Sequence, residues 1–126
     1  MYYQTYKQYG NVKKQVGNDN IRYDSGFEAN YANELFLRKK AKDIKDYEAH
    51  KRIDLVCNGY KVGCYEIDFV ISHNDGTIEY VETKGRKSEV WALKWKIFET
   101  MFMEDPNVKL SLVMQKTFKL HKPKKI

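Results

Sequence analysis

The chain has 126 residues, of which 42% are hydrophobic and 32% charged, and its formal net charge is +6. These values exclude a disordered chain and leave room for a single domain, residues 1–126, with one hydrophobic core. The positive charge favours an anionic partner, although a merely soluble basic protein has the same balance.

Two cysteines, Cys57 and Cys64, are too few for a disulfide scaffold, and their spacing fits no zinc motif. We expect two reduced thiols in a cytoplasmic protein, with a disulfide between them as the minor alternative. No apolar run reaches membrane-spanning length, and the first residues lack the apolar core of a signal peptide. We therefore expect no membrane partner. We also expect no small-molecule cofactor.

Both ends of the chain are polar. Residues 1–20 form a tyrosine-rich arm interleaved with lysines and without a helical period. The simpler interpretation is a loosely ordered segment that packs its tyrosines on the core, and the alternative is a contact with DNA or with a second protomer. Residues 119–126 are predicted to be a flexible basic tail that adds non-specific attraction to nucleic acid.

A first helix is predicted over residues 25–42, because apolar residues recur every four positions from Phe27 to Leu35. Ser25 and Glu28 have the spacing of a capping box, in which the glutamate reaches back to the serine amide. Two interpretations of Glu28 stay open: it caps this helix, or it is an acidic residue of a functional site.

A strand is predicted over residues 51–57, and the Asn58-Gly59 turn signal leads from it into the next strand. His50 stands alone beside basic residues. We favour a surface position or a phosphate contact for it over metal ligation.

The central feature is the stretch Glu66–Gly85, EIDFVISHNDGTIEYVETKG, whose two limbs alternate in polarity around a turn signal. If the loop is Asn74–Gly76, with Gly76 in the left-handed conformation, Asp68 lies directly opposite Glu82. Other loop lengths shift this register by one residue, so the register is a hypothesis.

Two carboxylates that converge on one point repel each other unless a cation lies between them. Mg²⁺ prefers one or two carboxylates together with water and phosphate oxygens, so Asp68 and Glu82 are candidate ligands, and the carbonyl of Thr83 is a further one. Lys84 is in phase with both acids and can orient a water or stabilise charge on a phosphate. The alternative is a solvated hairpin face with a cross-strand ion pair.

A second helix is predicted over residues 89–103, with Ser88 as its N-cap and an aromatic stripe from Trp91 to Phe102 that we assign to the core. An apolar strand over residues 108–114 follows. Basic residues that flank the helices and the hairpin are candidate DNA contacts, although those that end the first helix also suit ordinary capping. They are Lys39, Lys40, Arg86, Lys87, Lys94 and Lys96.

The predicted order is helix, three strands, helix and strand, which indicates an α/β or α+β domain with a mixed sheet flanked by helices. From Ser25 to Gln115 the chain resembles the PD-(D/E)xK nuclease superfamily. The matching segments are Ser25–Glu28, Ile67–Phe69 and Val81–Gly85. They look most like the endonuclease I Holliday junction resolvases of phages and related small phage nucleases, although Ile67 replaces the proline often found before the aspartate.

The resemblance implies a restriction-endonuclease-like αβββαβ core and metal-dependent hydrolysis of DNA. By it, Asp68 and Glu82 ligate Mg²⁺ or Mn²⁺, Glu28 completes the acidic set and Lys84 is the catalytic lysine. It also implies an intertwined homodimer acting on branched DNA, in the host cytoplasm if a phage encodes the chain. The alternatives are a nuclease that cuts, nicks or repairs duplex DNA, a basic adaptor with an unused site, and a structural phage protein.

Overall fold

The structure is a computed structural model that describes residues 14–15, 22–23, 26–84, 88–114 and 121–126. Its elements in chain order are β1 (Lys14–Gln15), β2 (Arg22–Tyr23), α2 (Gly26–Lys40), β3 (Asp46–Cys57), β4 (Tyr60–Ser72), β5 (Ile78–Lys84), α3 (Glu89–Phe102) and β6 (Val108–Met114). The long elements follow the predicted order of helix, three strands, helix and strand. The protein is an α+β domain, consistent with a restriction-endonuclease-like core.

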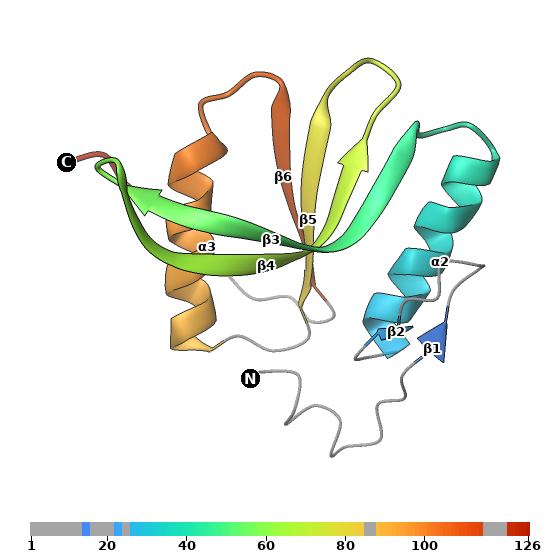
Figure 1. Ribbon diagram of the computed structural model, residues 1–126, viewed down its shortest axis with the longest axis horizontal. Coiled ribbons are helices and arrows are strands. Elements are labelled where there is room, and N and C mark those ends of the chain that lie inside the picture. Colours follow the sequence, from blue (N-terminus) through green and yellow to red (C-terminus); the bar gives the residue numbers. More distant parts are fainter. Residues whose placement is uncertain (1–13, 16–21, 24–25, 85–87, 115–120) are drawn as a thin grey trace.

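One four-stranded mixed sheet, in the order β3-β4-β5-β6, carries the fold (Figure 1). β3–β4 and β4–β5 are antiparallel hairpin pairs, whereas β5 and β6 are parallel. Parallel neighbours need a crossover connection, and α3 supplies it. β1 and β2 form a separate two-stranded antiparallel pair.

The two helices lie on opposite sides of the β5–β6 part of the sheet (Figure 1). Each covers its own hydrophobic cluster. The cluster under α2 consists of Ala29, Ala32, Leu35, Ile44, Phe69, Ile71 and Val81. The cluster under α3 consists of Leu55, Tyr65, Ile67, Val70, Trp91, Trp95 and Phe98. Trp91, Trp95 and Phe98 are buried and Phe102 packs against them partly buried, so the predicted core stripe of the second helix is confirmed. Fully burying one large apolar side chain stabilises a fold by roughly 1.5–3 kcal/mol.

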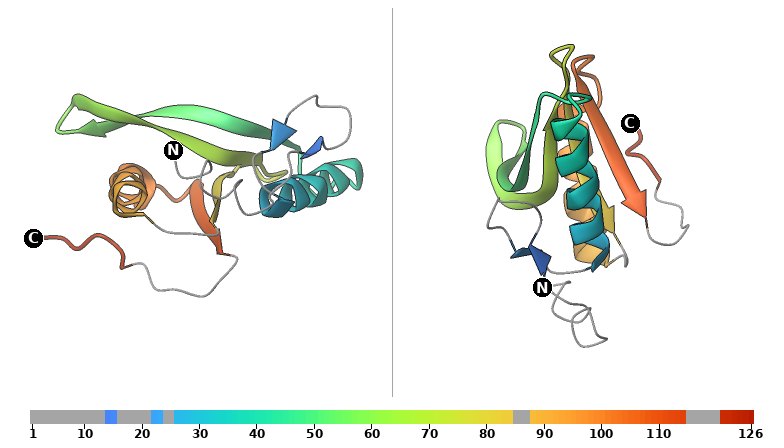
Figure 2. Two further views of the ribbon diagram at one scale, coloured as in Figure 1. Left: turned by 90° about the horizontal axis from the view of Figure 1, so that it is seen from below. Right: turned by 90° about the vertical axis from the view of Figure 1, so that its right-hand side faces the viewer.

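The β3–β4 hairpin is longer than predicted, because β3 begins at Asp46 rather than near residue 51. Figure 2 shows the hairpin extending across α3. The added residues pair with the end of β4, with Asp46 opposite Ser72 and Ala49 opposite Phe69, and Tyr47 and Ala49 pack against the cluster under α2. Leu55 and Tyr65 are buried against α3 and hold the outer half of the hairpin on the core. The Asn58-Gly59 turn at its tip is confirmed, with positive φ values of 52° and 81°.

Three smaller predictions concern the cysteines, the ends of the chain and the membrane. Cys57 and Cys64 are both free thiols, as expected. Of the predicted arm, residues 1–20, only Lys14–Gln15 is described, and in the tail Lys125 pairs with Glu104 at 3.2 Å. Within the described parts of the chain, no helix is long and apolar enough to cross a membrane.

Candidate functional site

The turn between β4 and β5 sets the register of the hairpin. Gly76 has a φ of 91°, its amide donates to the His73 carbonyl at 3.1 Å, and the His73 amide donates to the Thr77 carbonyl at 2.9 Å. The paired residues run from Ser72 opposite Ile78 to Phe69 opposite Val81. Carried one step further, this register places Asp68 opposite Glu82. The predicted left-handed Gly76 is confirmed, and the register agrees with the predicted one.

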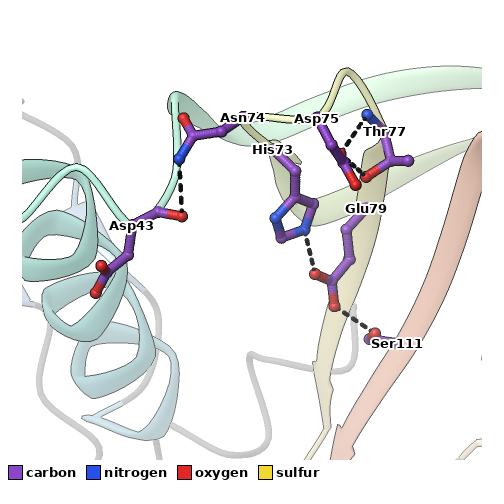
Figure 3. Close-up of polar contacts among 7 residues, drawn as sticks. All are labelled: Asp43, His73, Asn74, Asp75, Thr77, Glu79 and Ser111. Carbon is purple, nitrogen blue, oxygen red and sulfur yellow. Dashed lines mark hydrogen bonds and ion pairs between the residues drawn. The ribbon is translucent and has the colours of Figure 1, made fainter.

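Polar contacts tie this turn to β5, to β6 and to the connection between α2 and β3 (Figure 3). His73 Nε2 lies 2.8 Å from Glu79 Oε1 on β5, and the Ser111 hydroxyl on β6 donates to Glu79 Oε2 at 2.5 Å. The Asn74 side chain donates to the carbonyls of Lys42 and Asp43, which connect α2 to β3. The turn is thereby fixed in place relative to three other elements.

Asp68 lies in β4 and is only 3% exposed. The amide and the hydroxyl of Thr83 donate to its Oδ2 atom, at 2.9 and 2.8 Å. Burial raises the pKa of Asp68 well above its ordinary value, and the charges of Glu82 and Glu28 raise it further, while the Thr83 hydrogen bonds oppose the shift. Three carboxylates are therefore close enough to interact strongly.

Glu82 lies in β5, is 2% exposed and is held from the α3 side of the sheet. Trp91 Nε1 on α3 donates to Glu82 Oε2 at 3.0 Å and to the Tyr65 hydroxyl at the same distance. Burial raises the pKa of Tyr65 well above its ordinary value, and the charges of Glu82 and Asp68 add to the effect. The Trp91 hydrogen bond therefore orients the Glu82 carboxylate, and the nearby Tyr65 hydroxyl stays protonated beside it.

Glu28 lies in the first turn of α2 and is 1% exposed. Its Oε1 atom lies 2.9 Å from His50 Nε2 on β3. Ser25, the other half of the predicted capping box, lies outside the described residues. His50 is partly exposed, so part of its side chain lies at the surface as expected, but its contact with Glu28 was not predicted, and a phosphate contact stays a prediction.

The remaining predicted residues of the hairpin are described only in part. The backbone of Lys84 ends β5 and pairs with Met114 on β6, but its side chain lies outside the described part of the structure. Arg86 and Lys87 also lie outside it. The structure gives Thr83 a role as a donor to Asp68, and a metal contact through its carbonyl stays a prediction.

The other predicted DNA contacts are spread over two helices. Lys94 and Lys96 are partly buried on α3, the helix that also carries Trp91. Lys39 pairs with Asp46 at 2.8 Å, and Lys40 lies over the Phe36 ring at 5.7 Å. Lys39 lies eleven positions after Glu28, which is roughly 16 Å along the helix, so Lys39 and Lys40 lie at the opposite end of α2 from Glu28.

The chemistry of the donor set fits a hard divalent cation. In the described residues, no group of three His, Cys, Asp or Glu side chains is arranged to hold a metal ion by itself. Mg²⁺ does not need one, because it commonly takes one or two carboxylates and completes its shell with water and substrate phosphate oxygens. Asp68 and Glu82 satisfy that requirement, and a cation beside them would offset the repulsion that raises the pKa of Asp68.

Three residues that contact the acidic group or its partners were not predicted as members of the site. Trp91 was expected only in the core, Tyr65 was assigned no role, and His50 was placed on the surface. Only Trp91 carried a signal, since a buried indole N–H usually finds an acceptor, and it lies nine positions after Glu82. Tyr65 and His50 meet their partners through the fold.

The fold and the acidic group together define an α+β domain with buried carboxylates from α2, β4 and β5. Residues 6–122 match the model of a family described as "Protein of unknown function (DUF1064)", so the chain belongs to that family. No curated protein and no solved structure matches the chain.

Proposed function

We propose that the protein is a metal-dependent DNA endonuclease that hydrolyses phosphodiester bonds, using Mg²⁺ or, as a substitute, Mn²⁺. The observation that carries this proposal is the placement of buried Asp68 opposite buried Glu82, with Glu28 close enough to raise the pKa of Asp68. Burying several carboxylates together is unfavourable unless protons or cations neutralise them. The order of elements and the resemblance to the PD-(D/E)xK superfamily support the same function.

Asp68 and Glu82 are the proposed metal ligands, and Glu28 completes the acidic set. A bound magnesium ion would supply positive charge and lower the pKa of a bound water. Thr83 orients the carboxylate of Asp68, and Trp91 orients that of Glu82. Lys84, in sequence next to this group at the end of β5, is proposed to stabilise the charge that develops on the phosphate.

The proposed substrate is branched DNA, most simply a Holliday junction, with cleavage or nicking of duplex DNA as the alternative. No base-reading motif is evident in the sequence, and lysines and arginines that contact phosphates position DNA without selecting sequence. Arg86, Lys87, Lys94 and Lys96 are the proposed contacts of this kind. Two symmetric cuts at a junction require two active sites, so we propose a homodimer in the cytoplasm, which is the host's if a phage encodes the chain.

The test compares a labelled four-way junction with a linear duplex of the same sequence, in Mg²⁺, in Mn²⁺ and in chelator. Asp68→Asn and Lys84→Ala are each expected to reduce the rate by at least about 100-fold. Asp54→Asn is the matched control, because Asp54 is 61% exposed on β3 and pairs only loosely with Lys61, at 3.3 Å.

Each outcome separates the candidates. Paired, metal-dependent cuts near the branch point support a junction resolvase. Equal cutting of both substrates supports the duplex nuclease, and binding without cutting in either metal supports a non-catalytic adaptor. Cleavage that survives both substitutions contradicts the assignment of the site.

A further inference from the structure

His50 lies on β3 and contacts the acidic group, which its place in the sequence did not predict. Its Nε2 atom lies 2.9 Å from Glu28 Oε1, although 22 positions separate the two residues. Glu28 is almost fully buried, whereas the His50 side chain is 28% exposed. The imidazole therefore lies between the buried carboxylate and the protein surface.

The backbone at His50 is unusual for a strand. Its φ is 58°, in the left-handed region that residues with a side chain seldom adopt. The β3–β4 pairing includes Ala49 opposite Phe69 and Lys51 opposite Ile67, and this register places His50 opposite Asp68. The irregular residue of β3 thus falls directly beside a proposed metal ligand.

This irregularity lies where the side chains of β3 change their surroundings. Tyr47 and Ala49, before His50, pack against the cluster under α2, whereas Ile53 and Leu55, after it, pack in the cluster under α3. A regular strand keeps alternate side chains on one face, but the odd-numbered side chains of β3 meet different helices before and after His50. The left-handed residue lies at this change.

We propose that His50 is a positioning residue: its Nε2–H donates to Glu28 and holds that carboxylate toward Asp68 for metal binding. The proposal rests on the proposed function for the identity of the site. Groups that hydrogen-bond to metal-binding carboxylates orient them, and their loss typically weakens metal affinity about 10- to 100-fold. The left-handed backbone persists because the fold holds the side chain in this contact.

The experiment measures Mn²⁺ affinity by electron paramagnetic resonance in the full-length protein, with thermal unfolding in parallel. His50→Gly removes the imidazole, while glycine adopts a positive φ freely, so the fold is retained. His50→Gln keeps an N–H donor of similar reach. His73→Ala is the control, because His73 also bonds a glutamate, Glu79 at 2.8 Å, but outside the acidic group.

We expect His50→Gly to weaken Mn²⁺ binding at least about tenfold, and His50→Gln to stay within about threefold of wild type. His73→Ala is expected to lower the unfolding temperature without weakening Mn²⁺ binding. Wild-type affinity in His50→Gly, equal weakening in His50→Gln, or equal weakening in His73→Ala would each overturn the positioning role.

The same measurement separates this inference from the nuclease proposal. A wild-type protein that binds Mn²⁺ through Asp68, as judged by loss of binding in Asp68→Asn, but cuts no DNA overturns the nuclease function alone. The three histidine variants then still decide the role of His50. A wild-type protein that binds no Mn²⁺ overturns both proposals.

Discussion

The amide and the hydroxyl of Thr83 donate to one and the same oxygen of Asp68, at 2.9 and 2.8 Å. Both residues are buried, so each donor acts at low dielectric and fixes the rotation of the carboxylate. Hydrogen bonds to a carboxylate favour its ionised form, which is the form that binds a cation. If the proposed function is right, Thr83 therefore favours the cation-binding form of Asp68 even though burial disfavours its charge.

Thr83→Val removes the hydroxyl but keeps the amide donor and nearly the same shape. We expect the free energy of unfolding to fall by about 1 kcal/mol and the cleavage rate to fall about tenfold. Urea unfolding and junction cleavage measure the two effects. Thr77→Val is the control, since the Thr77 hydroxyl donates to exposed Asp75 in the turn, and its loss should leave cleavage unchanged. An unaltered cleavage rate in Thr83→Val would show that the amide alone orients Asp68.

Asp68→Asn is expected to stabilise the metal-free protein at neutral pH. Burial and the charges of Glu82 and Glu28 raise the pKa of Asp68 in the folded state well above its ordinary value of 3.8. Stability from such a group is present below that ordinary value and is lost as pH rises through the folded-state pKa. We therefore expect Asp68→Asn to be more stable than the wild type at pH 7 in chelator.

The advantage of Asp68→Asn should disappear in acid, where the aspartate is protonated in both states. Thermal unfolding across the pH range checks this, and Mg²⁺ should stabilise the wild type but not the variant. A variant that is less stable than wild type at pH 7 in chelator would contradict the raised pKa.

Local sequence signals predicted the scaffold of this site. The Asn74–Gly76 turn and the alternation of both limbs led to the register that places Asp68 opposite Glu82, because turn chemistry and strand period act within a few residues. The N-cap is a similar case, since Ser88 accepts from the Trp91 amide at 3.1 Å. Such features depend on neighbours along the chain.

The parts that could not be predicted depend on residues far apart in the sequence. The contact of His50 with Glu28 spans 22 positions and that of Trp91 with Tyr65 spans 26, and no period or turn signal encodes either distance. The length of β3 was underestimated for the same reason, because its first residues pair with the end of β4, where Asp46 lies opposite Ser72. Sequence patterns located the acids but not the residues that orient them.

Trp91→Phe is expected to affect the site more than the fold. Phenylalanine keeps most of the buried ring but removes the N–H that reaches both Glu82 and Tyr65. We expect a loss of about 1–3 kcal/mol in stability and a cleavage rate at least about tenfold lower. Trp95→Phe, one turn further along α3 and also buried, should cost similar stability while cleavage changes little. Equal cleavage in the two variants at a temperature where both are folded would refute a role for the indole N–H.

Glu79→Gln is expected to have the opposite pH dependence from Asp68→Asn. Burial raises the pKa of Glu79, but the hydrogen bonds from Ser111 and His73 outweigh it, so the pKa lies below its ordinary value of 4.5. Stability from such a group is present above pH 4.5 and is lost as pH falls through the folded-state pKa. The variant should therefore lose about 1.5–3 kcal/mol at pH 7 and lose less than wild type on acidification. Denaturant unfolding at several pH values measures this, and parallel pH profiles for the two proteins would count against it.

Gly76→Ala tests whether the turn sets the geometry of the acids. Gly76 has a φ of 91°, and a Cβ atom there would meet no neighbour within 4 Å, so the cost is one of backbone conformation alone. We expect a loss of about 1 kcal/mol or more, and a lower cleavage rate because strain at the turn opposes the register that places Asp68 opposite Glu82. Gly26→Ala is the matched control, since Gly26 also has open space but no positive φ and begins α2. That control should be neutral or slightly stabilising. If Gly76→Ala loses stability but cleaves at the wild-type rate, β4 and β5 keep their register without the glycine, and the pairing of the strands rather than the turn holds the two acids together.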